Sequence, residues 1–303
     1  MRIVSLVPHA TELLFELGLA EDVVGVTHEC DFPPPARERR QITRDLLPSG
    51  LAAGEIDAAV RERTLNGESI YELDRTALEE LEPDLIVTQA LCPVCAVSYD
   101  EVAELAAELS SRPRVLALDP KSLGETLDDV RTVARAAGVA ERGELLIERS
   151  AARIERVRLA VGEAPRRRVA ALEWLDPVYV AGHWTPELIA LAGGLDPLGL
   201  PRGHSQALSW EAVAEAEPEI VVVMPCGYDA PRAREEALAY AAELAALGAA
   251  RLVAVDASAY FSRPGPRLLD GLELLAQIIH PELLAEPPAP DRALPVELAG
   301  APR

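Results

Sequence analysis

The sequence has little positive charge and no long apolar run. Its 303 residues include 50 acidic and 29 basic side chains, a formal net charge of −21. Such a surface repels phosphate backbones and anionic headgroups, so we expect neither nucleic acid nor a membrane surface as a partner. No stretch reaches the ~18–20 apolar residues of a membrane span. The opening MRIVSLVPHATELLFELG breaks at Pro8-His9 and lacks the pattern of an export signal. We therefore expect a cytoplasmic protein, or a periplasmic or extracellular one if a leader was removed.

Aromatic residues and cysteines are scarce, and the common catalytic motifs are missing. Only 4% of the residues are aromatic and four are cysteines, and domains of the expected size can bury an apolar core without disulfide support. The chain contains no nucleophile elbow, no G-x-G-x-x-G fingerprint and no P-loop. We therefore do not expect an enzyme, although a carboxylate beside a histidine leaves acid–base chemistry open, with Glu12, Glu29, Asp31 and Asp256 as the candidates.

Short β-branched runs alternate with helical patterns along most of the chain. This alternation predicts an α/β fold: two Rossmann-like lobes with parallel sheets, joined by one long rigid helix over 140–161. The expected divisions are an N-terminal lobe at 1–122, connecting helices at 123–164, a C-terminal lobe at 165–282 and a loosely ordered Pro/Ala-rich tail at 283–303. The expected strands are Ile3–Val7, Val23–Thr27, Asp84–Thr88, Arg114–Leu118, Val169–Trp174, Ile220–Val223 and Leu252–Val255.

One segment of the first lobe has a counterpart in the second. ALEELEPDLIVTQALC ends at Cys92, and AVAEAEPEIVVVMPC ends at Cys226. Each is a helical pattern, a Glu-Pro-acid turn, a buried strand and a cysteine. The turn alone is common, but the cysteine at nearly the same offset favours internal pseudo-symmetry of the two lobes.

The unusual residues of the chain follow predicted strands. In open parallel sheets, ligands bind beyond the carboxyl ends of the strands, so these positions predict a binding site. The candidate ligand-binding residues are Pro8, His9, Thr11, Glu12, His28, Glu29, Asp31, Gln89, Trp174, Tyr179, His183, Trp184, Gly227, Tyr260 and Phe261.

Several of these segments resemble one family. SLVPHATELLFELG, VVGVTHECDFP, EPDLIVTQ and YFSRPGPRLLDGLELLAQIIHP are similar to the vitamin B12-binding branch of the periplasmic substrate-binding proteins. The resemblance implies two α/β lobes with a single helical connector and an inter-lobe cleft that holds a small-molecule ligand: cobalamin, a related corrinoid, haem or a siderophore. It also implies an ABC importer permease as partner, with Glu72 and Glu211 as docking candidates.

A corrinoid is large and flat, and needs an apolar platform with a few polar contacts. The aromatic candidates above, together with Tyr228, would supply the platform, and His28, His183 or His204 would approach the metal. Because the connecting helix is stiff, we expect a rotation of only a few degrees on binding.

The cysteines support an alternative. Cys92 and Cys95 have the C-x-x-C spacing with which two thiolates bind one ion, and Cys30 and Cys226 follow other strands. Four thiolates suit zinc or an iron–sulfur cluster, with a redox or enzymatic role. Inert buried thiols remain the other interpretation of these residues.

Overall fold

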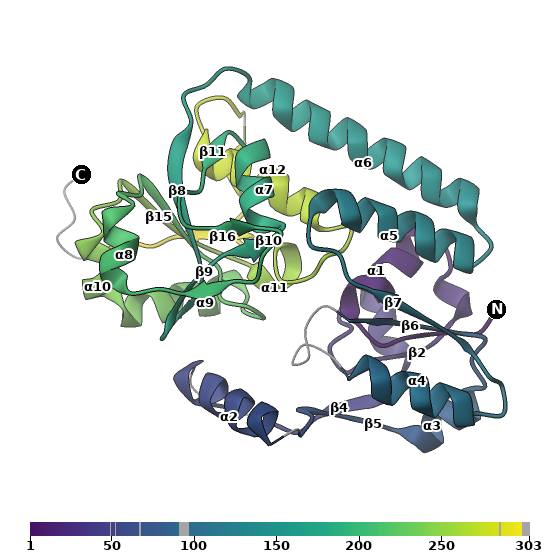
Figure 1. The fold of residues 1–303 in the computed structure, drawn as a ribbon. Coiled ribbons are helices and arrows are strands. Elements are labelled where there is room, and N and C mark those ends of the chain that lie inside the picture. The colour runs from purple at the N-terminus through teal and green to yellow at the C-terminus, as the bar shows by residue number, and fades with distance from the viewer. Residues whose placement is uncertain (49, 52, 67, 91–96, 285, 299–303) are drawn as a thin grey trace. The chain divides into compact units, whose positions relative to one another are not determined.

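The structure is a computed structural model, which describes residues 1–48, 50, 51, 53–66, 68–90, 97–284 and 286–298. The chain divides into two units, each described by itself (Figure 1). The first contains Met1–Pro120 and Gly124–Glu148, and the second contains Lys121–Leu123 and Arg149–Arg303. The division between residues 148 and 149 falls inside α6 (Ala140–Val161).

The first unit contains a parallel sheet of five strands. The order across the sheet is β3-β2-β1-β6-β7. The chain passes from β1 to β2 and β3 on one side and then places β6 and β7 on the other, so the order reverses beside β1. Ligand crevices of open sheets form at such a reversal. The strands are β1 (Ile3–Ser5), β2 (Val23–Val26), β3 (Arg40–Gln41), β6 (Leu85–Gln89) and β7 (Arg114–Leu118).

Helices pack on both faces of this sheet. Leu14 of α1 (Pro8–Glu16) and Val133 of α5 (Leu123–Ala136) share one buried cluster. Leu78 of α3 (Arg75–Leu81) and Val102 of α4 (Tyr99–Glu108) share the other. The remaining elements are η1 (Ala20–Asp22), η2 (Pro34–Glu38), α2 (Ala53–Leu65) and an antiparallel ribbon of β4 (Thr43–Asp45) and β5 (Tyr71–Leu73).

The second unit contains a mixed sheet. Its order is β13-β9-β8-β14-β15-β16, with β11 paired to β8. The central strands β8, β14 and β15 are parallel, whereas β9 and β16 run antiparallel to their neighbours. A separate pair joins β10 to β12. The strands are β8 (Arg167–Leu175), β9 (Val178–Val180), β10 (Gly182–His183), β11 (Gly194–Leu195), β12 (Leu200–Pro201), β13 (Gln206–Ala207), β14 (Ile220–Val223), β15 (Arg251–Val255) and β16 (Ala293–Pro295).

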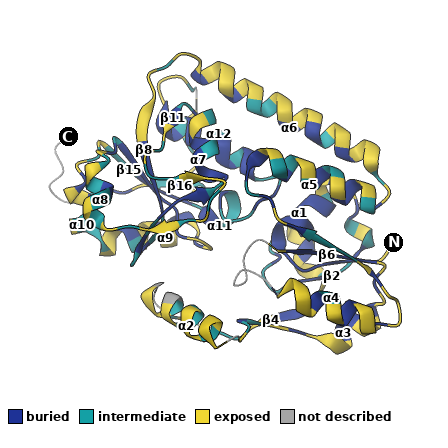
Figure 2. Ribbon diagram, viewed as in Figure 1, coloured by how far each residue is buried: buried dark blue, intermediate teal, exposed yellow. Residues whose placement is uncertain are grey.

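Side-chain caps explain where several helices of this unit begin. Ser209, Asp229 and Asp256 each accept a hydrogen bond from a backbone N–H of the first helical turn. Figure 2 shows that α12 (Leu268–Ile279) is largely buried, whereas α6 is mostly exposed and buried along one stripe only. The helices are α7 (Thr185–Leu191), α8 (Trp210–Glu215), α9 (Ala230–Ala239), α10 (Ala241–Ala246), α11 (Ala257–Tyr260) and α12 (Leu268–Ile279).

The internal repeat extends to individual hydrogen bonds. Glu82 and Glu217 both precede proline, and both have positive φ angles, of 39° and 46°. In the first unit, Arg2 donates its backbone N–H to the Asp84 carboxylate and its Nε to Leu81 O.

In the second unit, Arg168 donates its backbone N–H to the Glu219 carboxylate and its Nε to Glu217 O. The backbone N–H groups of Asp84 and Glu219 donate back to Arg2 O and Arg168 O. The same turn therefore connects helix to strand in each unit, as the sequence predicts.

The expectation of a loosely ordered tail at 283–303 is wrong in one segment. The structure pairs Ala293 with Val255 in an edge strand and buries Val296. The expectation of loose order is therefore wrong for 293–296. Proline is tolerated on an edge strand, where its missing N–H faces away from the ladder, so the Pro-rich composition concealed this strand.

Candidate functional site

The turn from β1 into α1 is held by buried hydroxyl groups. Thr11 Oγ1 donates to Ser5 Oγ at 2.8 Å, and Ser5 Oγ donates to Val7 O at 3.0 Å. Pro8 occupies the first turn of α1, where its fixed φ suits the helix and its missing N–H costs nothing. Thr11 thus shapes the backbone of this edge.

Cys30 lies in the interior beside the same turn. Its Sγ is 3.0 Å from Thr11 Oγ1 and 3.1 Å from Thr27 Oγ1. The side chain is buried, so the loop after β2 is anchored to α1 through this sulfur.

Two contacts with Thr43 position His28, a candidate ligand contact of the first unit. Its backbone N–H donates to Thr43 Oγ1 at 3.1 Å, and its Nδ1 lies 2.8 Å from the same oxygen. Its ring lies against Tyr71, with centroids 5.4 Å apart. Tyr71 in turn donates its hydroxyl to Glu29 Oε1 at 3.3 Å. The ribbon β4–β5 therefore supports two of the predicted residues.

The other candidates of the first unit differ in exposure. His9, Glu12 and Gln89 are buried, whereas Asp31 is half-buried. The main-chain oxygen of Asp31 accepts a hydrogen bond from Arg37 Nε at 2.9 Å. We conclude that the side chains of His28, Glu29 and Asp31 are the accessible ones at this edge.

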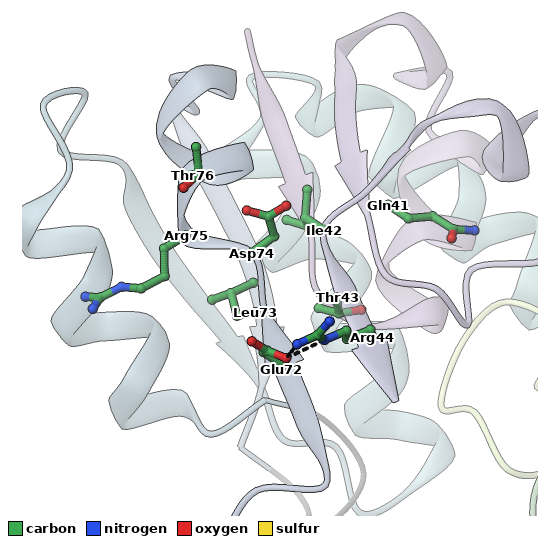
Figure 3. Close-up of a pocket in the computed structure, with 9 residues that line it drawn as sticks. All are labelled: Gln41, Ile42, Thr43, Arg44, Glu72, Leu73, Asp74, Arg75 and Thr76. Carbon is green, nitrogen blue, oxygen red and sulfur yellow. Dashed lines mark hydrogen bonds and ion pairs between the residues drawn. The ribbon is translucent and has the colours of Figure 1, made fainter. Parts of the chain in front are cut away.

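A pocket of about 490 Å³ opens along the ribbon and the start of α3 (Figure 3). Its lining is mainly polar and charged. Arg44 forms an ion pair with Glu72 on the outer face of the ribbon, while Thr43 faces inward to His28. Successive side chains of a strand alternate between faces, which explains this division. The lining residues are Gln41, Ile42, Thr43, Arg44, Glu72, Leu73, Asp74, Arg75 and Thr76.

The aromatic candidates of the second unit fall into two groups. Trp184 is buried and donates its Nε1–H to Phe261 O at 2.8 Å, and Phe261 is buried as well. Tyr228 is also buried, with its ring edge toward Trp174. These three side chains pack in the interior, so they do not form an exposed platform.

Trp174 and Tyr179 remain half-buried. They sit opposite each other across the antiparallel pair β8 and β9, and therefore share one face of that hairpin. Tyr260 is half-buried near Arg292, whose guanidinium carbon is 5.2 Å from the ring centroid. Gly227 is exposed, in the loop after β14.

His183 stands beside His204 in the same unit. Its Nε2 is 3.3 Å from His204 Nδ1. Glu173 accepts hydrogen bonds from the Ser205 hydroxyl and the Gly182 N–H, and burial raises the pKa of its carboxyl to about 7. Burial thus favours the protonated form of the Glu173 carboxyl.

The four cysteines of the predicted thiolate metal site lie in different places. Cys92 and Cys95 lie outside the described residues, Cys30 is buried in the first unit, and Cys226 is exposed in the second. In the described part of the chain, no three His, Cys, Asp or Glu side chains are grouped to hold a metal ion.

Sequence reasoning missed the residues that hold the candidates in place. Thr43 and Tyr71 position His28 and Glu29, and Ser205 holds Glu173. Each comes from a segment far away in sequence, and a single sequence carries no signal for such pairings.

No helix in the described residues combines the length and apolar character needed to cross a bilayer.

Solved structures of other proteins have the same fold as this chain. A solved periplasmic haem binding protein from Pseudomonas aeruginosa superposes with a TM-score of 0.73 at 20% identity, and covers 98% of each chain. At this identity the likeness shows a shared fold, which confirms the predicted α/β architecture with a parallel sheet in each of two lobes.

Two sequence relatives cover nearly the whole chain. The vitamin B12-binding protein of Vibrio cholerae serotype O1 is 25% identical over 281 residues, or 90% of this chain and 86% of the relative. An uncharacterized ABC transporter substrate-binding lipoprotein of Bacillus subtilis is 24% identical over 292 residues, or 94% and 82%. These names describe binding proteins rather than enzymes, as expected, and give no support to a cytoplasmic location or an iron–sulfur cluster.

The family model of the periplasmic binding proteins matches residues 3–255. This span contains both sheets apart from the edge strand β16. The chain therefore belongs to the periplasmic binding protein family.

Proposed function

We propose that this protein captures a metal-containing tetrapyrrole, with a cobalamin-like corrinoid as its ligand. The observation that carries the proposal is the likeness to a vitamin B12-binding protein over 90% of the chain. The accessible side chains at the strand ends support it, because they offer both apolar and polar contacts to a large flat ligand.

In the first unit the proposed contacts are His28, Glu29 and Asp31. The imidazole of His28 is held at Nδ1 by Thr43, so its Nε2 is the nitrogen left for the ligand. Carboxylates and an imidazole suit the amide groups at the rim of a corrinoid, since each can exchange a hydrogen bond with them.

In the second unit the proposed contacts are Trp174, Tyr179 and Tyr260. The first two share one face of a hairpin, and this arrangement suits stacking against a flat macrocycle. The expectation that a single site in a cleft uses residues of both units stays a prediction.

We also propose that the protein delivers its ligand to an ABC importer permease. The name of the Bacillus subtilis relative supports this role. Glu72 and Glu211 are the docking candidates: both are exposed, and Glu72 carries an ion pair with Arg44. The ligand would then be bound outside the cytoplasm.

Paired variants test the ligand contacts. We expect Tyr179→Ala and His28→Ala each to weaken cyanocobalamin binding at least about tenfold, the equivalent of about 1.4 kcal/mol. Tyr240→Ala is the matched control, because the Tyr240 ring stacks on Trp210 and is not among the proposed contacts. Isothermal titration calorimetry measures the affinity of the parent and of each variant for cyanocobalamin. Equal affinities in all variants would show that the ligand binds elsewhere.

A further inference from the structure

Two histidine rings of the second unit lie within contact distance of each other. His183 Nε2 and His204 Nδ1 are 3.3 Å apart, with ring centroids separated by 5.1 Å and planes at 85°. His183 is half-buried and His204 is exposed, so both rings can be reached from solvent.

The main chain sets the spacing of the two rings. His183 N–H donates to Gly203 O at 2.6 Å, and Arg202 N–H donates to His183 O at 2.9 Å. His183 has a φ of 52°, which is unusual for a residue other than glycine. At Gly182, an added Cβ would lie 2.5 Å from Gly203 O, so only glycine permits this approach of the two segments.

The Glu173 carboxyl also connects the same two segments. It accepts hydrogen bonds from the N–H of Gly182, which precedes His183, and from the hydroxyl of Ser205, which follows His204. The carboxyl therefore holds the backbone next to each of the two histidines in place.

The separation of the two nitrogens matches a shared metal ion. Two nitrogens bound at about 2.05 Å in a tetrahedral arrangement lie about 3.3 Å apart. We propose that His183 and His204 together bind one divalent transition-metal ion, such as Zn²⁺ or Cu²⁺. This proposal needs no tetrapyrrole and is independent of the proposed function.

Metal binding requires a proton to move and the two rings to turn until both lone pairs converge on one ion. One ring now donates an N–H to the other, and both facing nitrogens present lone pairs once that proton moves to the far nitrogen of its own ring. Water completes the coordination, because the described residues group no third metal-ligating side chain with the pair. Among common ions, Cu²⁺ should bind more tightly than Zn²⁺.

The test is a calorimetric titration of the full-length chain with Zn²⁺. The protein carries no polyhistidine tag, and Cys92→Ser, Cys95→Ser and Cys226→Ser are present in every sample so that accessible thiolates do not compete. We expect one site, with affinity reduced at least about tenfold by His204→Gln or His183→Asn. Asparagine tolerates positive φ and helps the variant fold. Gln206→Ala, at an exposed position two residues after His204, is the control and should bind Zn²⁺ as the parent does.

Electron paramagnetic resonance with Cu²⁺ supplies a second readout. We expect hyperfine coupling from two imidazole nitrogens in the parent and from at most one in His204→Gln. The proposal is overturned if both histidine variants bind Zn²⁺ like the parent, or if Gln206→Ala loses the site as well.

Discussion

At the scale of single residues, the site depends on side chains that hold other side chains. His28 follows a strand, and the sequence predicts its position for that reason. Thr43, which fixes its ring, comes from a separate ribbon. Trp184 and Phe261 also follow strands, yet both are buried. Position after a strand is therefore predictable, whereas exposure and partners depend on packing that a single sequence does not specify.

Replacing Thr43 tests whether its hydroxyl holds the ring of His28 in place. Thr43→Val keeps the shape of a buried side chain but removes the oxygen that contacts His28 twice. We expect a loss of about 1 kcal/mol of unfolding free energy, and weaker cyanocobalamin binding because His28 is no longer held. Urea denaturation and calorimetry measure the two effects. Thr64→Val is the control, since its hydroxyl bonds only to Val60 O on an exposed helix. Unchanged binding in Thr43→Val would contradict a role for the held ring.

The Glu173 carboxyl should make stability depend on pH. Burial raises its pKa from 4.5 to about 7, so the folded state keeps a proton that the unfolded chain has released over that interval. Stability therefore falls as the pH rises from about 4.5 to about 7. The full effect is on the order of 3 kcal/mol, at about 1.4 kcal/mol per pKa unit.

Glu173→Gln mimics the protonated carboxyl and should remove this dependence. We expect the variant to match the parent protein near pH 4.5 and to exceed it in stability at pH 8. Urea midpoints at both pH values give the comparison. Parallel pH profiles of parent and variant would refute the assignment.

At the scale of elements, the repeat was the most predictable feature. The Glu-Pro-acid turn recurs in both halves of the sequence, and the structure reproduces its arginine hydrogen bonds in each unit. The edge strand β16 was not predictable, because Pro287, Pro288 and Pro290 closely precede it. The antiparallel β9 was missed as well, since it follows β8 after a turn at Asp176-Pro177.

One arginine attaches α6 to α12. Arg153 donates to Glu273 from Nε at 2.9 Å and to both Glu273 and Asp270 from Nη2, at 2.7 and 2.9 Å. We expect Arg153→Ala to cost about 1–3 kcal/mol of unfolding free energy, because the two carboxylates lose a charged partner. Chemical denaturation of the parent and the variant measures this loss of unfolding free energy.

Arg158→Ala is the matched control on the same helix. Arg158 is 63% exposed, against 27% for Arg153, and pairs only with Glu155 three residues away. Such exposed pairs contribute about 0.2–0.5 kcal/mol. Similar losses in the two variants would contradict a special role for Arg153.

At the scale of the whole molecule, composition and resemblance predict the family but not the ligand. A net charge of −21 argues against nucleic acid, and the matched family consists of binding proteins. Corrinoids and haem are both flat macrocycles with a metal, so the same residue types suit either. The choice depends on details of packing around the ligand.

Ligand binding should change the arrangement of the two units by only a few degrees, because α6 joins them as one continuous helix. Small-angle X-ray scattering of the protein with and without cyanocobalamin measures the change. A large decrease in the radius of gyration would contradict this prediction.

Equilibrium titration of the intact protein with cyanocobalamin, with haemin in parallel, tests the central claim most directly. The account predicts one equivalent of cyanocobalamin bound with a dissociation constant of about 1 μM or tighter, and preferred over haemin. Binding of haemin alone, or of neither compound, would contradict it.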